Sequence, residues 1–188
     1  MIVIFGGAFN PPTLAHYEIA EKLINKFKPD DFYFLPVGNR YKNKTMLEFN
    51  YRYDMVKIMA DKLGAKVSTM ENEESYRGTY YALLDFKKID PETYFVMGAD
   101  NLDYLDKWIN ASELIKTNKF IVLSRNGFDV YKLVNEKYFE YKDNFHIVEI
   151  NNYLSSTLFR TNLEKSILLE DVYEYIKKNN LYGVDLND

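Results

Sequence analysis

Apolar and polar positions alternate along the chain with two different periods, which predict strands and helices in turn. Short continuous apolar runs are typical of strands that are buried on both faces. Apolar residues three and four positions apart are typical of amphipathic helices. The predicted strands lie at 1–5, 32–37, 65–70, 93–98, 119–124 and 145–150. The predicted helices lie at 17–27, 51–63, 80–89, 109–117 and 130–139, with two short ones at 155–166 and 169–180.

The order of these elements predicts the fold class. Strands that alternate with helices form βαβ units, whose strands are parallel. We therefore expect an α/β fold with a Rossmann-like, doubly wound, mostly parallel sheet and helices on both faces. The chain shows neither an internal repeat nor a linker, so we expect a single domain over residues 1–188.

Composition excludes several classes of protein. The chain has 188 residues, a net charge of -4 and no cysteine, so disulfides and thiolate chemistry are excluded. No apolar run reaches the roughly 18–20 residues of a membrane span. The acidic balance argues against a broad nucleic-acid surface. We expect a cytoplasmic protein that binds neither nucleic acid nor membrane.

The stretch "IFGGAFNPPTLAH", from Ile4 to His16, connects the first predicted strand to the first helix. In open α/β sheets ligands bind outside the carboxyl ends of the strands. Glycines allow close approach of backbone N–H groups, and a helix N-terminus favours anions. The stretch has neither the P-loop pattern nor the dinucleotide pattern. It is interpreted as a phosphate site, with a rigid turn and a capping histidine as the alternative.

The stretch "LSSTLFR", from Leu154 to Arg160, opens a predicted helix with hydroxyl side chains. Arg160 follows Thr157 by about one helical turn, so the two lie on a similar face. Hydroxyls, a helix start and an arginine can together bind a polyphosphate. An ordinary helix cap with an exposed arginine is the alternative.

The stretch "FVMGADNLDYLDKW" places Asp100 just beyond the end of a predicted strand. A carboxylate at that position suits ribose hydroxyls. Trp108, the one tryptophan of the chain, can stack on an aromatic ligand or fill the core.

Taken together, these stretches resemble the H/T-x-G-H nucleotidyltransferase superfamily. "GGAFNPPTLAH" is similar to its first loop, and "LSSTLFR" is similar to its I-S-S-T-x-I-R motif. "MGADNLDYLDKW" resembles a stretch of bacterial nicotinate mononucleotide adenylyltransferases, and the resemblance covers nearly the whole chain. It implies that the mononucleotide phosphate attacks the α-phosphorus of ATP and that pyrophosphate leaves, in NAD biosynthesis. It also implies Mg²⁺, brought with ATP.

The resemblance also implies roles for individual residues. His16 contacts the α-phosphate, with Thr13 and Arg160 as further catalytic residues. The implied ATP-binding residues are Gly6, Gly7, Ala8, Phe9, His16, Gly98, Asp100, Ser155, Ser156 and Arg160. The implied mononucleotide-binding residues are Asn10, Lys42, Lys44, Tyr80, Tyr81 and Trp108, with Trp108 stacked on the pyridine ring. No protein ligand to a metal is expected.

The chain departs from the family pattern at two positions that bear on substrate. Ala15 stands where the motif has glycine, and Tyr81 stands where many members have threonine. Nicotinamide mononucleotide therefore stays open as an equal or preferred substrate. Another H/T-x-G-H enzyme, such as a pantetheine-phosphate adenylyltransferase, and a catalytically inactive nucleotide-binding regulator also stay open. So does a homo-oligomer.

Overall fold

Six strands form one parallel sheet in this computed structural model, which describes residues 1–40, 46–124, 129–150 and 155–184. Their spatial order is β3-β2-β1-β4-β5-β6, and every pair of neighbours is parallel. The strands are β1 (Ile2–Gly7), β2 (Asp31–Pro36), β3 (Lys66–Val67), β4 (Thr93–Gly98), β5 (Lys119–Ser124) and β6 (Phe145–Glu149). This is the doubly wound Rossmann order, so the predicted fold class is confirmed.

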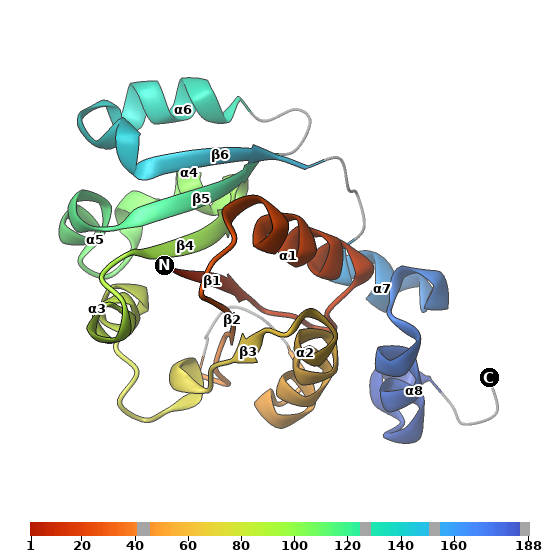
Figure 1. The fold of residues 1–188 in the computed structure, drawn as a ribbon. Coiled ribbons are helices and arrows are strands. Elements are labelled where there is room, and N and C mark those ends of the chain that lie inside the picture. Colours follow the sequence, from red (N-terminus) through yellow and green to blue (C-terminus); the bar gives the residue numbers. More distant parts are fainter. Residues whose placement is uncertain (41–45, 125–128, 151–154, 185–188) are drawn as a thin grey trace.

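Helices cover both faces of the sheet, because successive strand residues point to opposite faces. Val3 and Phe5 pack under α1 (Leu14–Phe27) and α2 (Phe49–Leu63). Ile2 and Ile4 belong to the other face. That face is covered by α3 (Thr79–Ile89), α4 (Ala99–Asp103), α5 (Ala111–Thr117) and α6 (Val130–Lys137). Figure 1 shows α1 and α2 on one side of the sheet and α3 and α5 on the other.

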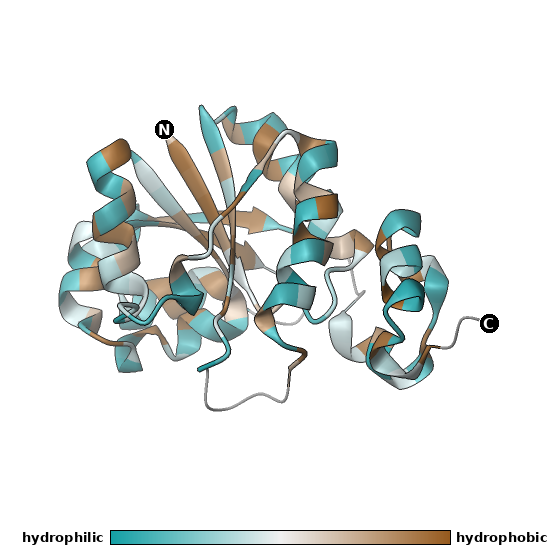
Figure 2. Cartoon of the chain, turned by 90° about the horizontal axis from the view of Figure 1, so that it is seen from below, coloured by the Kyte–Doolittle hydropathy of each residue, from teal (hydrophilic) through white to brown (hydrophobic). Residues whose placement is uncertain are grey.

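The C-terminal elements form a separate apolar cluster against α2. They are α7 (Ser156–Asn162), α8 (Glu170–Lys178) and the short 3₁₀ helix η5 (Leu181–Gly183). Met55 of α2 joins Phe159, Ile176 and Leu181 in this cluster. Figure 2 shows these segments, which lead to the C-terminus, to one side of the helices that cover the sheet. The remaining 3₁₀ helices are η1 (Met70–Asn72), η2 (Leu105–Lys107), η3 (Phe139–Asn144) and η4 (Lys165–Ile167).

Several expected elements have other bounds in the structure. The helix expected at 155–166 ends at Asn162, because Leu163 has left-handed backbone (φ 52), and η4 follows it. The strand expected at 65–70 shrinks to Lys66–Val67, because η1 begins at Met70, whose N–H donates to the Ser68 hydroxyl at 3.3 Å. The helix expected at 109–117 begins only at Ala111, because Asn110 has left-handed backbone (φ 54). The five-residue helix α4, which no hydrophobic period predicts, follows β4 directly.

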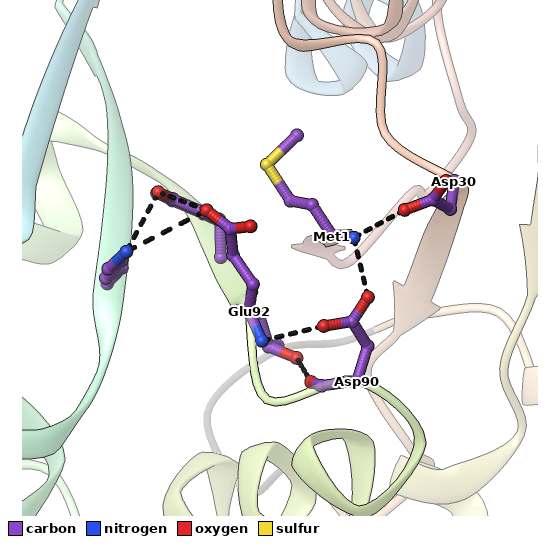
Figure 3. A network of polar contacts seen from close by, with 7 residues as sticks. Met1, Asp30, Asp90 and Glu92 are labelled. Carbon is purple, nitrogen blue, oxygen red and sulfur yellow. Dashed lines mark hydrogen bonds and ion pairs between the residues drawn. The ribbon is translucent and has the colours of Figure 1, made fainter.

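The chain start closes the end of the sheet where β1, β2 and β4 begin (Figure 3). The Met1 ammonium lies 2.6 Å from carboxylate oxygens of both Asp30 and Asp90. These two hydrogen bonds raise the pKa of the ammonium group to about 10. Asp90 also accepts the Glu92 N–H at 2.8 Å. The network links the chain start to the α1–β2 and α3–β4 connections at the amino ends of the strands. The opposite, carboxyl ends are where ligands bind in such a sheet.

The order reverses between β1 and β4, which makes their carboxyl ends the expected binding position in such a sheet. Among the described residues, no helix is long and apolar enough to cross a lipid bilayer.

Candidate active site

Two adjoining cavities open at the carboxyl ends of β1 and β4. The first has a volume of about 470 Å³ and the second about 450 Å³. Ala8 and Asn101 border both, so the cavities meet between the β1–α1 loop (residues 8–13) and α4. A ligand in each cavity would therefore approach the other at Ala8.

The first cavity brings together residues from three distant stretches of the sequence. His16 of α1, Asp100 of α4 and Arg160 of α7 all border it. The other predicted ATP contacts on its lining are Ala8, Gly98, Ser155 and Ser156. Asp100 is the one acidic side chain among these lining residues, beside an arginine and a histidine. With a neutral imidazole the charges of Asp100 and Arg160 cancel, so it is the N–H and O–H donors of Arg160, Ser155 and Ser156 that favour an anionic ligand.

The geometry at the start of α1 selects one tautomer of His16. The Thr13 N–H donates to Nδ1 of His16 at 3.0 Å, and the Thr13 hydroxyl lies 2.9 Å from the same nitrogen. A backbone N–H can only donate, so Nδ1 is an acceptor. The neutral ring therefore carries its proton on Nε2. His16 thus completes the cap of its own helix, and its side chain borders the first cavity.

Helix α7 holds the β1–α1 loop through its first residues. The Ser156 hydroxyl donates to the Pro11 carbonyl at 2.7 Å, and the Arg160 Nη1 donates to the Asn10 carbonyl at 2.6 Å. Ser155 caps the helix by accepting the Leu158 N–H at 3.2 Å. The ordinary helix cap is thus present at Ser155, and the polar residues of α7 border the first cavity as well.

Arg52 of α2 supports the same loop from beneath, although the sequence pattern gave it no role. Its side chain is completely buried. Nη1 donates to the Ala8 carbonyl at 3.0 Å and Nε donates to the Leu47 carbonyl at 2.7 Å. Burial lowers the pKa of its guanidinium. Its one signal in the sequence is that it is among only five arginines.

Asn10 is the residue on which several of these contacts converge. Its Oδ1 accepts the Tyr182 hydroxyl at 2.8 Å and the Leu47 N–H at 3.2 Å. The η5 segment, far away in the sequence, therefore helps to hold the loop. Asn10 borders the first cavity and not the second, so the structure puts it beside the predicted ATP residues.

The second cavity is lined partly by aromatic residues. Trp108 borders it, with its ring edge-to-face with Phe95 at 6.1 Å. Gly78 and Thr79, at the start of α3, also border it, and no side chain caps that helix. Backbone N–H groups of an uncapped first turn can receive an anion. An aromatic wall beside such a helix start suits a planar, negatively charged group.

The two glycines of β1 make room for the protein's own rings. A Cβ on Gly6 would lie 2.7 Å from the Phe95 ring, and one on Gly7 would lie 2.9 Å from the Phe9 ring. Both glycines border the second cavity. A side chain on Gly6 would displace the Phe95 ring, which is part of the cavity wall, and one on Gly7 would displace the buried Phe9 ring.

The model of the cytidylyltransferase-like family matches residues 4–162. A relative from Acholeplasma laidlawii, named "Probable nicotinate-nucleotide adenylyltransferase", is 35% identical over 94% of this chain and 100% of its own length. A relative of the same name from Clostridium acetobutylicum is 34% identical over 95% of this chain and 97% of its own length. The chain belongs to the nicotinate-nucleotide adenylyltransferase family.

The fold agrees with this membership. The nicotinic acid mononucleotide adenylyltransferase of Plasmodium falciparum, solved in complex with NaAD, superposes with a TM-score of 0.81 at 24% identity over 98% of both chains. Its complex with APC superposes with a TM-score of 0.78. The resemblance stated from the motifs is confirmed.

Not every residue assigned from the family pattern lies on a cavity. Thr13 and Phe9 are buried and border neither: Thr13 contacts His16 and Phe9 packs in the core. Tyr80 and Tyr81 do not border the second cavity; Tyr81 borders a third one, which lies between residues 70–77 and α3. The two loop lysines, Lys42 and Lys44, lie outside the described residues.

The structure also adds residues to this family site that the motifs missed. Asn101 borders both cavities, and the only signal was its place directly after Asp100. Glu71 and Arg77 border the second cavity but lie in a stretch with no helical or strand period.

Glu71 is a buried carboxyl group on the second cavity. It is 8% exposed, and burial raises its pKa to about 7, against the lowering effects of a hydrogen bond with Tyr76 and of the Arg52 charge. The unfolded chain releases this proton near pH 4.5, so between about pH 4.5 and about pH 7 the folded protein keeps a proton that the unfolded chain has lost. The contribution of Glu71 to the free energy of unfolding is therefore fully present below pH 4.5 and is lost as the pH rises through about 7.

We expect Glu71→Gln to remove this loss. Between about pH 5 and about pH 8 the parent should lose on the order of 3 kcal/mol through Glu71, and the variant should not. Urea unfolding of both proteins at the two pH values measures the difference, since all other titrating groups are common to both. Parallel pH dependence of the two proteins would contradict the assignment.

Proposed function

We propose that this protein transfers the adenylyl group of ATP to nicotinate mononucleotide, releasing pyrophosphate and forming nicotinate adenine dinucleotide for NAD biosynthesis. The observation that carries the proposal is the pair of cavities that meet at Ala8. One has polyphosphate-binding chemistry and the other has an aromatic wall. Their junction lets a phosphate from one ligand reach the α-phosphorus of the other.

In the first cavity, catalysis rests on positioning and on charge stabilisation. The His16 Nε2–H donates to the α-phosphate as charge develops on it. Arg160 and the hydroxyls of Ser155 and Ser156 hold the departing pyrophosphate. The Arg160 guanidinium has five N–H donors, and it hydrogen-bonds the Asn10 carbonyl and the Thr157 hydroxyl. Its remaining donors can bind phosphate while it holds the loop.

In the second cavity, the pyridine ring stacks on Trp108. Thr79 and the uncapped start of α3 lie where the ring substituent would be received. In the first cavity, Asp100 beside Gly98 receives the ribose hydroxyls of ATP. Ala15, in place of the glycine of the motif, also borders the first cavity, where its methyl group narrows the approach of the nucleotide.

The divalent ion fits this site through the substrate. Mg²⁺ is bound through one or two carboxylates and phosphate oxygens, and it keeps several waters. Within the described residues no three His, Asp or Glu side chains gather as a metal site. Asp100 is the available carboxylate on the first cavity. Bound Mg²⁺ would supply charge neutralisation on the polyphosphate.

The test is pyrophosphate release from ATP and Mg²⁺ with nicotinate mononucleotide, nicotinamide mononucleotide or phosphopantetheine as acceptor. We expect release with the nicotinate form above all. Release only with phosphopantetheine would indicate the other H/T-x-G-H activity. Binding of ATP without release with any acceptor would indicate an inactive regulator. The cytoplasmic location and a homo-oligomer stay predictions, which fractionation and sedimentation can check.

A further inference from the structure

Arg77 stacks on the ring of Tyr81 at the edge of the second cavity. Its guanidinium carbon lies 4.1 Å from the centroid of the Tyr81 ring. An arginine at this distance stacks on the ring face, and its planar N–H edge stays available to a carboxylate or phosphate. Arg77 borders the same cavity as Trp108 and Thr79.

Tyr81 is itself anchored from two sides. The Asn110 Nδ2 donates to its hydroxyl at 2.9 Å, and Tyr80 packs edge-to-face on its ring at 5.3 Å. Tyr81 stands where many family members have threonine, but its bulk does not enter the second cavity. Tyr81 packs against Arg77 instead. The hydroxyl-bearing residue of this stretch that borders the second cavity is Thr79.

The charges around Arg77 leave it suited to an external anion. Glu73, Glu74 and Asp85 border the third cavity with it, yet within the described part of the chain no carboxylate lies within 4.0 Å of its nitrogens. Arg40, the other arginine on the second cavity, pairs with Glu74 at 3.2 Å and has a side chain 69% exposed. Arg77 is an exposed residue as well, but its contact among the described residues is with the Tyr81 ring and not with a carboxylate.

Glu71 faces the same cavity and could oppose an anion there. Burial raises the pKa of its carboxyl group to about 7, so it is largely neutral below that pH. The cavity then presents two arginines and a neutral acid.

We infer that Arg77, positioned by Tyr81, contacts the carboxylate on the pyridine ring and makes this chain prefer the acid mononucleotide over the amide. The inference rests on the proposed function and names the residue that decides its substrate. A forked, charge-assisted contact favours a carboxylate over a neutral amide, which offers one acceptor and two donors.

The test compares kcat/KM for the two mononucleotides in the parent and in Arg77→Gln. We expect the parent to prefer the acid form. The variant should lose about 30-fold in kcat/KM with the acid form, mainly through KM, and less than about threefold with the amide. Lys88→Gln is the control: it removes an exposed cation of α3 that borders neither of the two cavities, and it should change both values by less than about threefold.

Variants of Tyr81 separate positioning from direct contact. Tyr81→Phe keeps the ring and should stay near the parent, whereas Tyr81→Leu removes the stack and should lose about fivefold with the acid form alone. A merely structural role would lower kcat/KM for both mononucleotides equally.

Calorimetric titration with each mononucleotide, without ATP, tests the inference apart from turnover. The parent should bind the acid form more tightly, and Arg77→Gln should weaken only that binding. Equal binding of the two forms by the parent, or equal losses in the variant, would overturn the inference even if pyrophosphate is released. Absence of turnover with retained acid preference would instead overturn the proposed function alone.

Discussion

Replacing His16 with alanine is expected to lower kcat with nicotinate mononucleotide by about 10²–10³-fold. That is the usual effect of removing one preorganised donor at developing charge. The neutral ring has its N–H on Nε2, because Nδ1 accepts the Thr13 N–H at 3.0 Å. Steady-state kinetics of pyrophosphate release measures the change, and KM for ATP should change much less than kcat.

The chain offers a matched control in its second histidine. His146 lies on β6, with its ring 5.3 Å from Tyr94, and borders neither cavity. His146→Ala should keep kcat within about twofold of the parent. The His16 variant also loses part of a helix cap, at a cost of about 1 kcal/mol, so its unfolding should be recorded. A folded His16→Ala protein that turns over at the parent rate would refute the role of the imidazole.

Replacing Arg52 with leucine is expected to destabilise the fold by about 3 kcal/mol. The change leaves the partly buried carbonyls of Ala8 and Leu47 without their donors, and each unpaired group of this kind costs up to roughly 1–3 kcal/mol. Urea unfolding measures the loss. Because Ala8 lies where the two cavities meet, kcat/KM should fall as well.

Arg52→Lys separates the effect of the positive charge from that of the planar guanidinium, which donates to two carbonyls at once. Lysine keeps the positive charge but cannot reach two carbonyls in one plane. Its stability should lie between those of the parent and the leucine variant. A leucine variant that unfolds within about 1 kcal/mol of the parent would show that water or backbone movement satisfies the two carbonyls.

The sequence by itself determined the fold class and the strands at the centre of the sheet. The strands predicted at 93–98 and 119–124 have the same bounds in the structure. Both are continuous apolar runs buried on both faces, so local pattern and burial agree there. Most of the residues that the motifs assigned to ATP border the first cavity, because strand ends and helix starts meet at one edge of a parallel sheet. Gly6 and Gly7 border the second cavity instead, and Phe9 borders neither.

Only the tertiary structure decided which side chains support the site and what the departures from the family pattern do. Arg52 has a role because α2 passes beneath the β1–α1 loop, and Tyr182 because η5 returns to Asn10. Tyr81 lies outside the second cavity, where its hydroxyl accepts a hydrogen bond from Asn110 and its ring stacks with Arg77. Contacts between residues 29 to 172 positions apart have no local period. The spacing of apolar residues shows which face of one helix or strand packs against the core. The roles of these residues depend instead on which helices, strands and loops the fold brings together.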